Sequence, residues 1–294
     1  MVSYSQSPVL FSNELLQNKN EYSSNNLKKN DFEIPDQAKF GIRYQNVKEF
    51  VKIMTAAKIL NLCNCHGSKE GLFIRGLTDD HITYCDVTLK KEIFQNLFFK
   101  EILDVDGKNI SSITFGLKMD TFCKYLSKLA SMEYVDVFLI GTDILRLSTQ
   151  NVSYDIRLLD IQEQALNVIL DDVSCFIQLS IDTQIFSNAI NSLSKIGENI
   201  QFNFLKNHRL NLCSSDITCS GNINITDQPG SGLYFHKFQE SSFTYDFKII
   251  ETIFKYNFSN SIDLMFNNEG VLKCKHFLYP QGYIIFLVAS RIQD

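Results

Sequence analysis

From residue 40 onward, apolar and polar positions follow an order that repeats four times along the chain. In the first round, residues 40–44 alternate as a strand does, and residues 47–59 carry an apolar stripe at helical spacing. Three alternating runs follow at residues 59–65, 71–77 and 82–89, separated by short polar turns. The predicted unit is therefore a strand, a helix and a three-stranded meander. The helix is expected to turn inward the apolar residues Val47, Phe50, Val51, Met54 and Ala57.

The same order occurs in three further rounds, whose helices are predicted at residues 120–132, 182–196 and 248–256. Asp120 and Asp182 stand where a helix N-cap is expected. Each unit has one apolar side to bury, so pairs of units predict an α+β fold. Its two tandem, similar domains would each hold two helix-plus-meander units, with the helices on one face of the sheets. The inward positions expected on the second and third helices are Phe122, Tyr125, Leu126, Leu129, Ile185, Ala189, Ile190 and Leu193.

Changes in composition along the chain predict the domain boundaries. Residues 1–39 are rich in Asn, Ser, Lys and Glu, which predicts a disordered or loosely attached extension. Residues 40–160 are expected to form the first domain and residues 173–294 the second. The segment at residues 161–172 falls between the second and third rounds, and we interpret it as the connector between the domains.

Lysines gather on the helix sides opposite the predicted apolar stripes. Lys48 and Lys52 lie one turn apart on the first helix, as do Lys124 and Lys128 on the second, and carboxylates are sparse there. Point charges on rigid helices suit contact with phosphates that reads no base sequence. The alternative is an ordinary solvated helix face, which lysine commonly populates. The lysines expected to face DNA are Lys48, Lys52, Lys58, Lys118, Lys124, Lys128, Lys195, Lys248 and Lys255.

The overall composition limits the classes of protein to consider. The chain is 45% hydrophobic and 21% charged, which is typical of a globular protein. A formal net charge of −5 excludes a wholly basic DNA-binding module, although not a local basic surface. Its eight cysteines show no disulfide-framework spacing, and no secretory signal or bilayer-length apolar run is found. We therefore expect free thiols in a reducing compartment and no contact with a membrane.

No group of residues in the sequence indicates an enzyme. The cluster of Cys63, Cys65 and His66 lacks a second pair at zinc spacing, and strand alternation places both cysteines on one face. Asp104 and Asp106 are the candidates for a metal-dependent nuclease, without the further carboxylates that a two-metal site needs. We therefore expect no catalysis, no metal and no cofactor, and keep a nuclease as the less favoured alternative.

The repeated units with lysine-bearing helices resemble the sliding clamps typified by proliferating cell nuclear antigen. Among those clamps, the sequence is more similar to the Rad-one type subunit of the nine-one-one checkpoint clamp. The similarity is carried by residues 81–101, which include the step Ile93-Phe94-Gln95, and by residues 114–125 and 269–277. It extends diffusely over residues 40–292.

The resemblance implies a ring of three similar subunits around duplex DNA. An ATP-driven clamp loader would place it there, in the nucleus, where it would serve repair and checkpoint proteins. Subunits of such rings join through unpaired edge strands, here expected at residues 152–159 and 218–225. The edge residues are Val152, Tyr154, Ile156, Leu158, Thr218, Ser220, Ile223 and Ile225. The connector would border a pocket for partner peptides, with Leu166, Val168 and Ile169 as apolar contacts.

Two compositions of the ring stay open. The third and fourth helices carry fewer lysines than the first two, which favours a heterotrimer whose subunits share charge unevenly and act as a DNA-damage checkpoint scaffold. The alternative is a homotrimeric replicative or virus-type processivity clamp.

Overall fold

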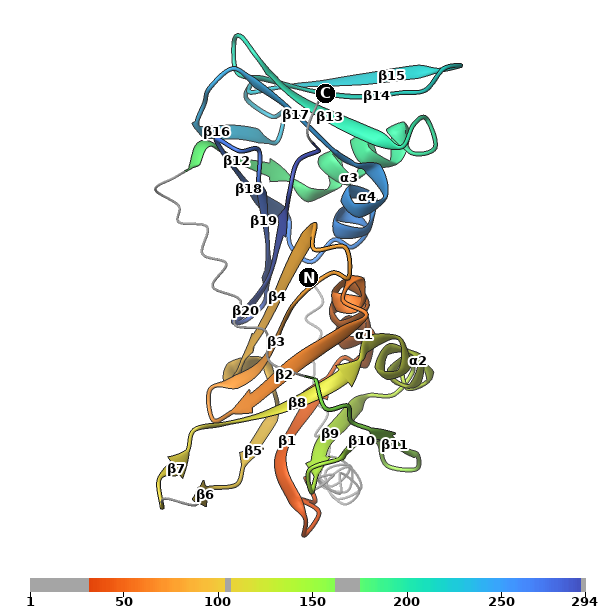
Figure 1. Cartoon of the computed structure of the whole chain (residues 1–294), viewed down its shortest axis with the longest axis vertical. Helices are drawn as coiled ribbons and strands as arrows, with labels where there is room; N and C mark the ends of the chain where they lie inside the picture. Colours follow the sequence, from red (N-terminus) through yellow and green to blue (C-terminus); the bar gives the residue numbers. More distant parts are fainter. Residues whose placement is uncertain (1–31, 104–106, 162–174, 292–294) are drawn as a thin grey trace, which may run out of the picture. The chain divides into compact units, whose positions relative to one another are not determined.

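The computed structural model describes residues 32–103, 107–161 and 175–291. Residues Ile34–Asp294 form one compact unit, to which all the described helices and strands belong (Figure 1). The predicted extension at residues 1–39 falls mostly outside the described residues, and so does the predicted connector at 161–172 apart from Ile161. The described helices fall short of what a bilayer crossing requires in length and apolar character.

The first two rounds of the repeat occur in the predicted order. The first round consists of β1 (Ala38–Gln45), α1 (Val47–Ala56), the 3-10 turn η2 (Ala57–Ile59), β2 (Leu62–Ser68), β3 (Gly71–Leu77) and β4 (Thr83–Lys90). Between the rounds lie η3 (Lys91–Ile93), β5 (Asn96–Phe99), β6 (Ile102–Leu103) and β7 (Asn109–Ile110). The second round consists of β8 (Ser112–Lys118), α2 (Met119–Lys128), β9 (Tyr134–Ile140), β10 (Ile144–Ser148) and β11 (Ser153–Arg157).

The third and fourth rounds follow the same order. The third consists of β12 (Cys175–Asp182), α3 (Thr183–Leu193), β13 (Asn199–Leu205), β14 (Arg209–Ser215) and β15 (Ser220–Thr226). An additional strand, β16 (Leu233–Lys237), comes before the fourth round. The fourth consists of β17 (Ser241–Asp246), α4 (Phe247–Phe254), β18 (Ser261–Asn267), β19 (Leu272–Leu278) and β20 (Gly282–Val288).

The first strand of each round pairs with the meander of the other round in its half of the chain. Strand β1 pairs with β9, and β8 pairs with β2. In the second half, β12 pairs with β18 and β17 pairs with β13. The exchange gives a five-stranded sheet in the order β11-β10-β9-β1-β5 and a four-stranded sheet in the order β15-β14-β13-β17. Each half is therefore an interlocked pair of rounds.

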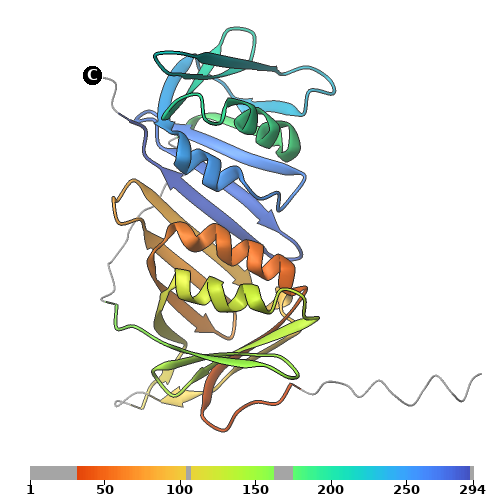
Figure 2. The same cartoon turned by 90° about the vertical axis from the view of Figure 1, so that its right-hand side faces the viewer.

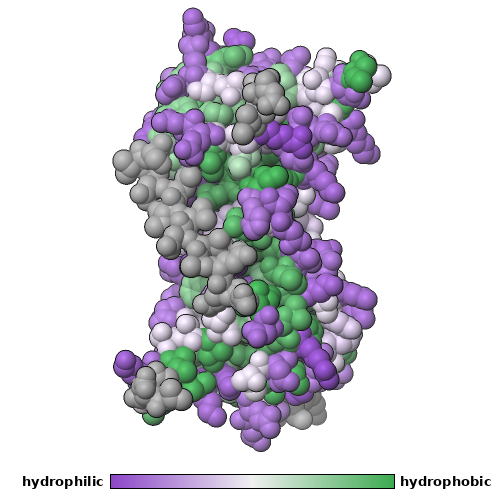
Figure 3. Space-filling model, viewed as in Figure 1, coloured by the Kyte–Doolittle hydropathy of each residue, from purple (hydrophilic) through white to green (hydrophobic). Residues whose placement is uncertain are grey.

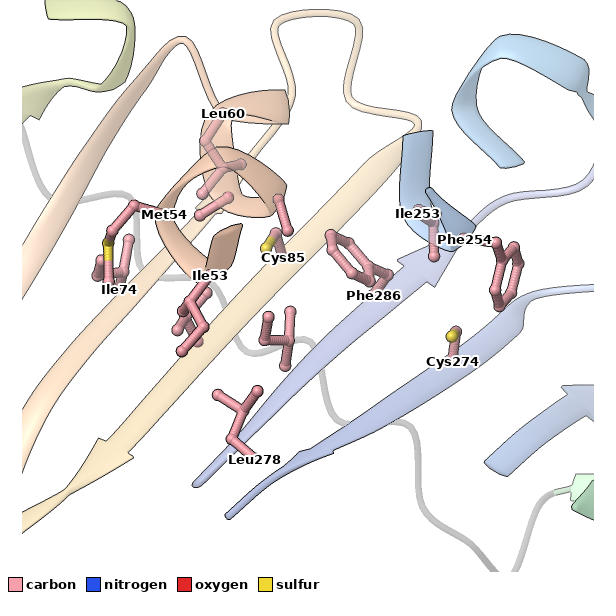
Figure 4. Close-up of a cluster of buried hydrophobic side chains, with 14 of the residues drawn as sticks. Ile53, Met54, Leu60, Ile74, Cys85, Ile253, Phe254, Cys274, Leu278 and Phe286 are labelled. Atoms are coloured by element: carbon pink, nitrogen blue, oxygen red, sulfur yellow. The ribbon is translucent and has the colours of Figure 1, made fainter. Parts of the chain in front are cut away.

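The two halves share one nine-stranded sheet, in the order β16-β12-β18-β19-β20-β4-β3-β2-β8. It is continuous because β4 of the first round pairs antiparallel with β20 of the fourth, from Thr83↔Val288 to Leu89↔Gly282. Figure 4 shows the apolar layer over this junction, where Cys85 of β4 and Phe286 of β20 lie between side chains of α1 and α4. The core therefore runs without a break from the first round to the fourth.

All four helices cover one face of the sheets, with α1 beside α2 and α3 beside α4 (Figure 2). This confirms the predicted α+β class with helices on one face. The buried stripes agree with the prediction on α1 and α2, except that Val51 and Tyr125 are only half-buried. On α3 the prediction was wrong at Ile185, which is 37% exposed, because Phe186 takes the inward position.

The two predicted helix caps have different outcomes. Asp182 caps α3, since its carboxylate accepts a hydrogen bond from the Ile185 N–H at 2.9 Å. Asp120 does not cap α2, because the helix starts one residue earlier and places this side chain in its first turn. Asp246, which the sequence pattern did not single out, caps α4 by accepting hydrogen bonds from the Lys248 and Ile249 N–H groups.

Candidate nucleic-acid interface and subunit edges

Six of the predicted DNA-facing lysines lie on or beside the first pair of helices. Lys48 and Lys52 are on α1, Lys124 and Lys128 are on α2, and all four are exposed. Lys58 ends η2 and Lys118 ends β8, and both are also exposed. Hydrophilic side chains cover the margin of the molecule where α2 lies (Figure 3). The lysines therefore share the side of the sheets that the helices cover.

Two of these lysines have partners of their own. Lys58 is 2.7 Å from Asp120, and this hydrogen bond raises the pKa of the lysine and lowers that of the carboxyl group. The Lys128 ammonium group lies over the rings of Tyr125 and Tyr154, 4.9 and 5.4 Å from their centroids. Lys58 is therefore partly neutralised, whereas Lys128 is held in place with its charge intact.

The second pair of helices carries less charge. Lys248 lies in the first turn of α4 and Lys255 at its C-terminal end, with exposed Glu251 between them. Lys195 lies two residues beyond the end of α3, in a left-handed backbone conformation. The exposed polar side chains of α3 itself are uncharged and comprise Gln184, Asn188 and Asn191. A phosphate backbone passing over the four helices would meet most cations at α1 and α2.

The two predicted edge segments both contain a strand at the end of a sheet. β11 is the outermost strand of the five-stranded sheet, and β15 is the outermost strand of the four-stranded sheet. Ile156 and Ile225 are buried in the core of the chain, whereas Tyr154 and Ile223 are half-buried and Ser220 is exposed. Val152 and Leu158 flank β11, and Thr218 lies in the bend before β15.

The predicted peptide-pocket residues Leu166, Val168 and Ile169 lie outside the described residues. The segment leading to them packs on β8, where Leu159 forms a bridge with Gly116 and donates its N–H to the Gly116 carbonyl at 3.0 Å. A side chain at Gly116 would meet the Leu159 carbonyl oxygen within 2.3 Å, so glycine is needed for this approach.

The described residues show no grouping suited to catalysis. Cys63 and Cys65 are buried on one face of β2, and burial raises the pKa of the Cys65 thiol well above its usual value. Among the described residues, no three His, Cys, Asp or Glu side chains are grouped so that they could hold a metal ion. The nuclease candidates Asp104 and Asp106 lie outside the described ranges.

One polar trio was not found from the sequence. The Ser180 hydroxyl donates to Asp263 at 2.8 Å and lies 2.9 Å from Nε2 of His236. A serine nucleophile requires the histidine between the serine and the carboxylate. Here the serine is in the middle, so the trio joins three neighbouring strands and activates no nucleophile.

Comparison with known proteins places this arrangement among solved folds. No family model matches the chain. The "DNA polymerase sliding clamp" of Pyrococcus abyssi is 20% identical over 260 residues, covering 87% of this chain and 99% of that protein. The "DNA polymerase sliding clamp 1" of Thermococcus kodakarensis is 19% identical with the same coverage. The crystal structure of proliferating cellular nuclear antigen from Entamoeba histolytica superposes with a TM-score of 0.74 at 14% identity, over 87% of this chain and all of that one. The chain has the sliding-clamp fold.

The expected resemblance to sliding clamps is thereby confirmed at the level of the fold. The finer resemblance to the Rad-one type subunit stays a prediction, since the relatives named above are polymerase clamps. Within the sliding-clamp fold of this chain, the lysine-bearing helices and the edge strands β11 and β15 are the surfaces to which function can be assigned.

Proposed function

We propose that the chain is a subunit of a ring-shaped DNA sliding clamp, which encircles duplex DNA without reading its sequence. The observation that carries this proposal is the cluster of Lys48, Lys52, Lys124 and Lys128, exposed on neighbouring helices of a chain with a net charge of −5. Because the helices are packed on the sheets, their lysines are held as fixed points for phosphate contact. The sliding-clamp fold supports the same function.

The open edges β11 and β15 support the ring. An unpaired strand at each end of a subunit provides two sites for main-chain hydrogen bonds with neighbours. Head-to-tail contacts of this kind close into a ring when the rotation between subunits allows it. A closed ring has to be opened around DNA, so a clamp-loading ATPase is a further proposed partner.

Threading on DNA tests the proposal without a loader. The protein is incubated at ring-forming concentration with linear duplex DNA, both ends are then blocked with streptavidin, and retention is measured in high salt. We expect retention on blocked DNA and rapid loss once a restriction enzyme cuts off one block. Equal loss from blocked and open DNA would contradict encirclement.

Charge reversal tests the DNA-facing surface. Changing Lys48, Lys52, Lys124 and Lys128 to Glu is expected to lower threading at least about ten-fold, because phosphates are then repelled. The matched control reverses Lys90, Lys91, Lys100 and Lys206, which are exposed and lie on none of the four α-helices. Both variants change the net charge equally, so an equal effect of the two would refute the assignment of this surface.

Within this function we place first a ring of identical chains that serves as a processivity clamp. It is supported by the names of the similar archaeal proteins, which are DNA polymerase sliding clamps, and by the two edges of this chain, whose side chains complement each other. The client would be a DNA polymerase, as in those proteins.

A second candidate is the heterotrimeric checkpoint scaffold. It is supported by the uneven charge of the helices, since Lys248 and Lys255 are diluted by Glu251 and α3 itself carries no lysine. In a mixed ring, the other subunits would supply the missing charge and repair and checkpoint proteins would bind, in the nucleus. Mass photometry of the purified chain separates the candidates: a monomer that assembles only with two other subunits supports the checkpoint ring, and a trimer of the chain alone supports the first candidate.

A further inference from the structure

Four polar side chains form a hydrogen-bonded row across the four-stranded sheet. Ser242 donates to Asn203 at 2.7 Å, Asn203 donates to Asn211 at 3.1 Å, and Asn211 donates to Asn224 at 3.0 Å. Each residue of the row stands opposite the next in the strand register. All the donors point the same way, so the row ends on the exposed Asn224 with an amide that still has N–H groups to donate at the open edge of β15.

The open edge of β11 carries the matching acceptor. Asp155 is exposed there and receives two hydrogen bonds from Arg146 of β10, at 2.7 and 2.8 Å. The guanidinium group lowers the pKa of Asp155, so the carboxylate stays ionised at neutral pH. A carboxylate bound on one side by arginine keeps further acceptor positions for a donor across the edge.

The backbone of β11 is oriented for pairing through the same residues. Hydrogen bonds from the Thr149 N–H to the Val152 carbonyl and from the Leu158 N–H to the Asp143 carbonyl show which residues face β10. In an antiparallel pair, alternate residues turn their backbone groups the other way. The residues whose N–H and C=O groups face outward are therefore Ser153, Asp155 and Arg157.

The backbone of β15 follows the same alternation. The Asp227 N–H donates to the His208 carbonyl at 3.1 Å, which places the odd-numbered residues of β15 toward β14. The residues whose backbone groups face outward are then Ser220, Asn222, Asn224 and Thr226. On both edges, the outward backbone groups belong to the residues whose side chains lie on the face away from the helices.

We propose that β11 of one copy pairs antiparallel with β15 of a second copy, with Asp155 opposite Asn224. The proposal rests on the ring function and names the neighbour in the ring as another molecule of this chain. In this register Arg157 stands opposite Asn222, and Ser153 opposite Thr226, so every outer pair joins a donor to an acceptor. On the helix side, Tyr154 stands opposite Ile225 and Ile156 opposite Ile223.

The helix side of the edge favours this register. A hollow of about 400 Å³ lies between α3 and β15, lined by Ile185, Ala189, Ile223 and Ile225 among others. Ile185 faces it and is 37% exposed, as the apolar floor of an unfilled contact would be. Pairing brings Tyr154 to this hollow, already packed on Tyr125 with 5.0 Å between the ring centroids. A register shifted by two residues places Ile156 opposite Gly221 and loses this match.

Changing one amide to a carboxylate tests the register. Asn224→Asp keeps the oxygen that accepts from Asn211, so the chain should fold, but it sets a second carboxylate against Asp155 of the neighbour. By mass photometry, we expect wild-type particles of three times the 33.8 kDa chain mass. Asn224→Asp should raise the trimer dissociation midpoint about ten-fold or more. Adding Asp155→Asn to the same chain removes the repulsion and should restore trimers.

Asn222→Asp is the matched control, because the same change two residues away faces Arg157 of the neighbour. It should leave the trimer unchanged or make it tighter. Equal weakening by the two Asp variants, or no weakening by Asn224→Asp, would overturn the register. A wild-type chain that is monomeric and forms rings only with other subunits would overturn the second copy as neighbour and leave DNA encirclement standing. A trimer that fails to thread on DNA would instead refute the proposed function and leave the register intact.

Discussion

Arg43 and Asp136 form a buried ion pair between strands that are 93 residues apart in the chain. The guanidinium group donates two hydrogen bonds to the carboxylate, at 2.6 and 2.7 Å. Their side chains are 4% and 10% exposed, and Arg43 also lies over the ring of Tyr134, 4.1 Å from its centroid. The two residues stand opposite each other in the pairing of β1 with β9, so the ion pair ties the first round to the second.

Arg43→Met should be strongly destabilising, because it leaves the Asp136 carboxylate buried without its counter-charge. We expect the free energy of unfolding to fall by about 3–5 kcal/mol, measured by urea denaturation. The double variant Arg43→Met/Asp136→Leu removes both charges and should lose less stability than Arg43→Met alone. Additive losses from the two changes would show that the pair is not coupled.

His276 should make folding stability depend on pH. It is fully buried among the rings of Phe254, Phe258 and Phe286, and burial lowers its pKa from 6.5 to about 4. Between these values the unfolded chain binds the proton and the folded chain does not. Stability is therefore complete above about pH 6.5 and is lost as pH falls toward 4, by up to about 3 kcal/mol. In His276→Leu this part of the pH dependence should disappear from denaturation curves, whereas the same change at the exposed His81 should leave it.

The two predicted caps should respond differently to alanine. Asp182→Ala removes the acceptor for the Ile185 N–H and should lower the free energy of unfolding by about 1 kcal/mol. Asp120→Ala removes a fully exposed carboxylate that caps nothing and should change stability little. Thermal unfolding of the two variants side by side measures the difference, and equal shifts would mean that the cap contributes nothing.

The order of the elements could be predicted because it depends on local patterns. Alternation and helical spacing gave all four rounds, and the edge positions of β11 and β15 follow from their place at the end of each meander. The exchange of β1 and β8 between rounds could not be predicted in this way, since pairing partners far apart in sequence leave no mark on local periodicity. The continuity of β4 with β20 was missed for the same reason.

The errors at single residues have local causes. Ile185 and Phe186 are adjacent and both apolar, so spacing alone did not decide which one faces the core. Asp120 lies one residue inside α2, within the usual uncertainty of a helix boundary. The row that ends at Asn224 was missed because asparagine is abundant throughout the chain, and its alignment across strands becomes visible only with the register. For the lysines, the sequence predicted exposure, which the structure shows, and orientation toward DNA, which stays a prediction.

The pairing of β4 with β20 also limits where a ring of these chains can open. Their ladder joins the halves over the whole length of both strands, from Thr83↔Val288 to Leu89↔Gly282, and is covered by buried side chains. Parting the halves would expose this core, whereas parting β11 from β15 breaks one short strand pair between two folded molecules. The gate that admits DNA should therefore lie between subunits, and each subunit should pass through loading as a rigid segment.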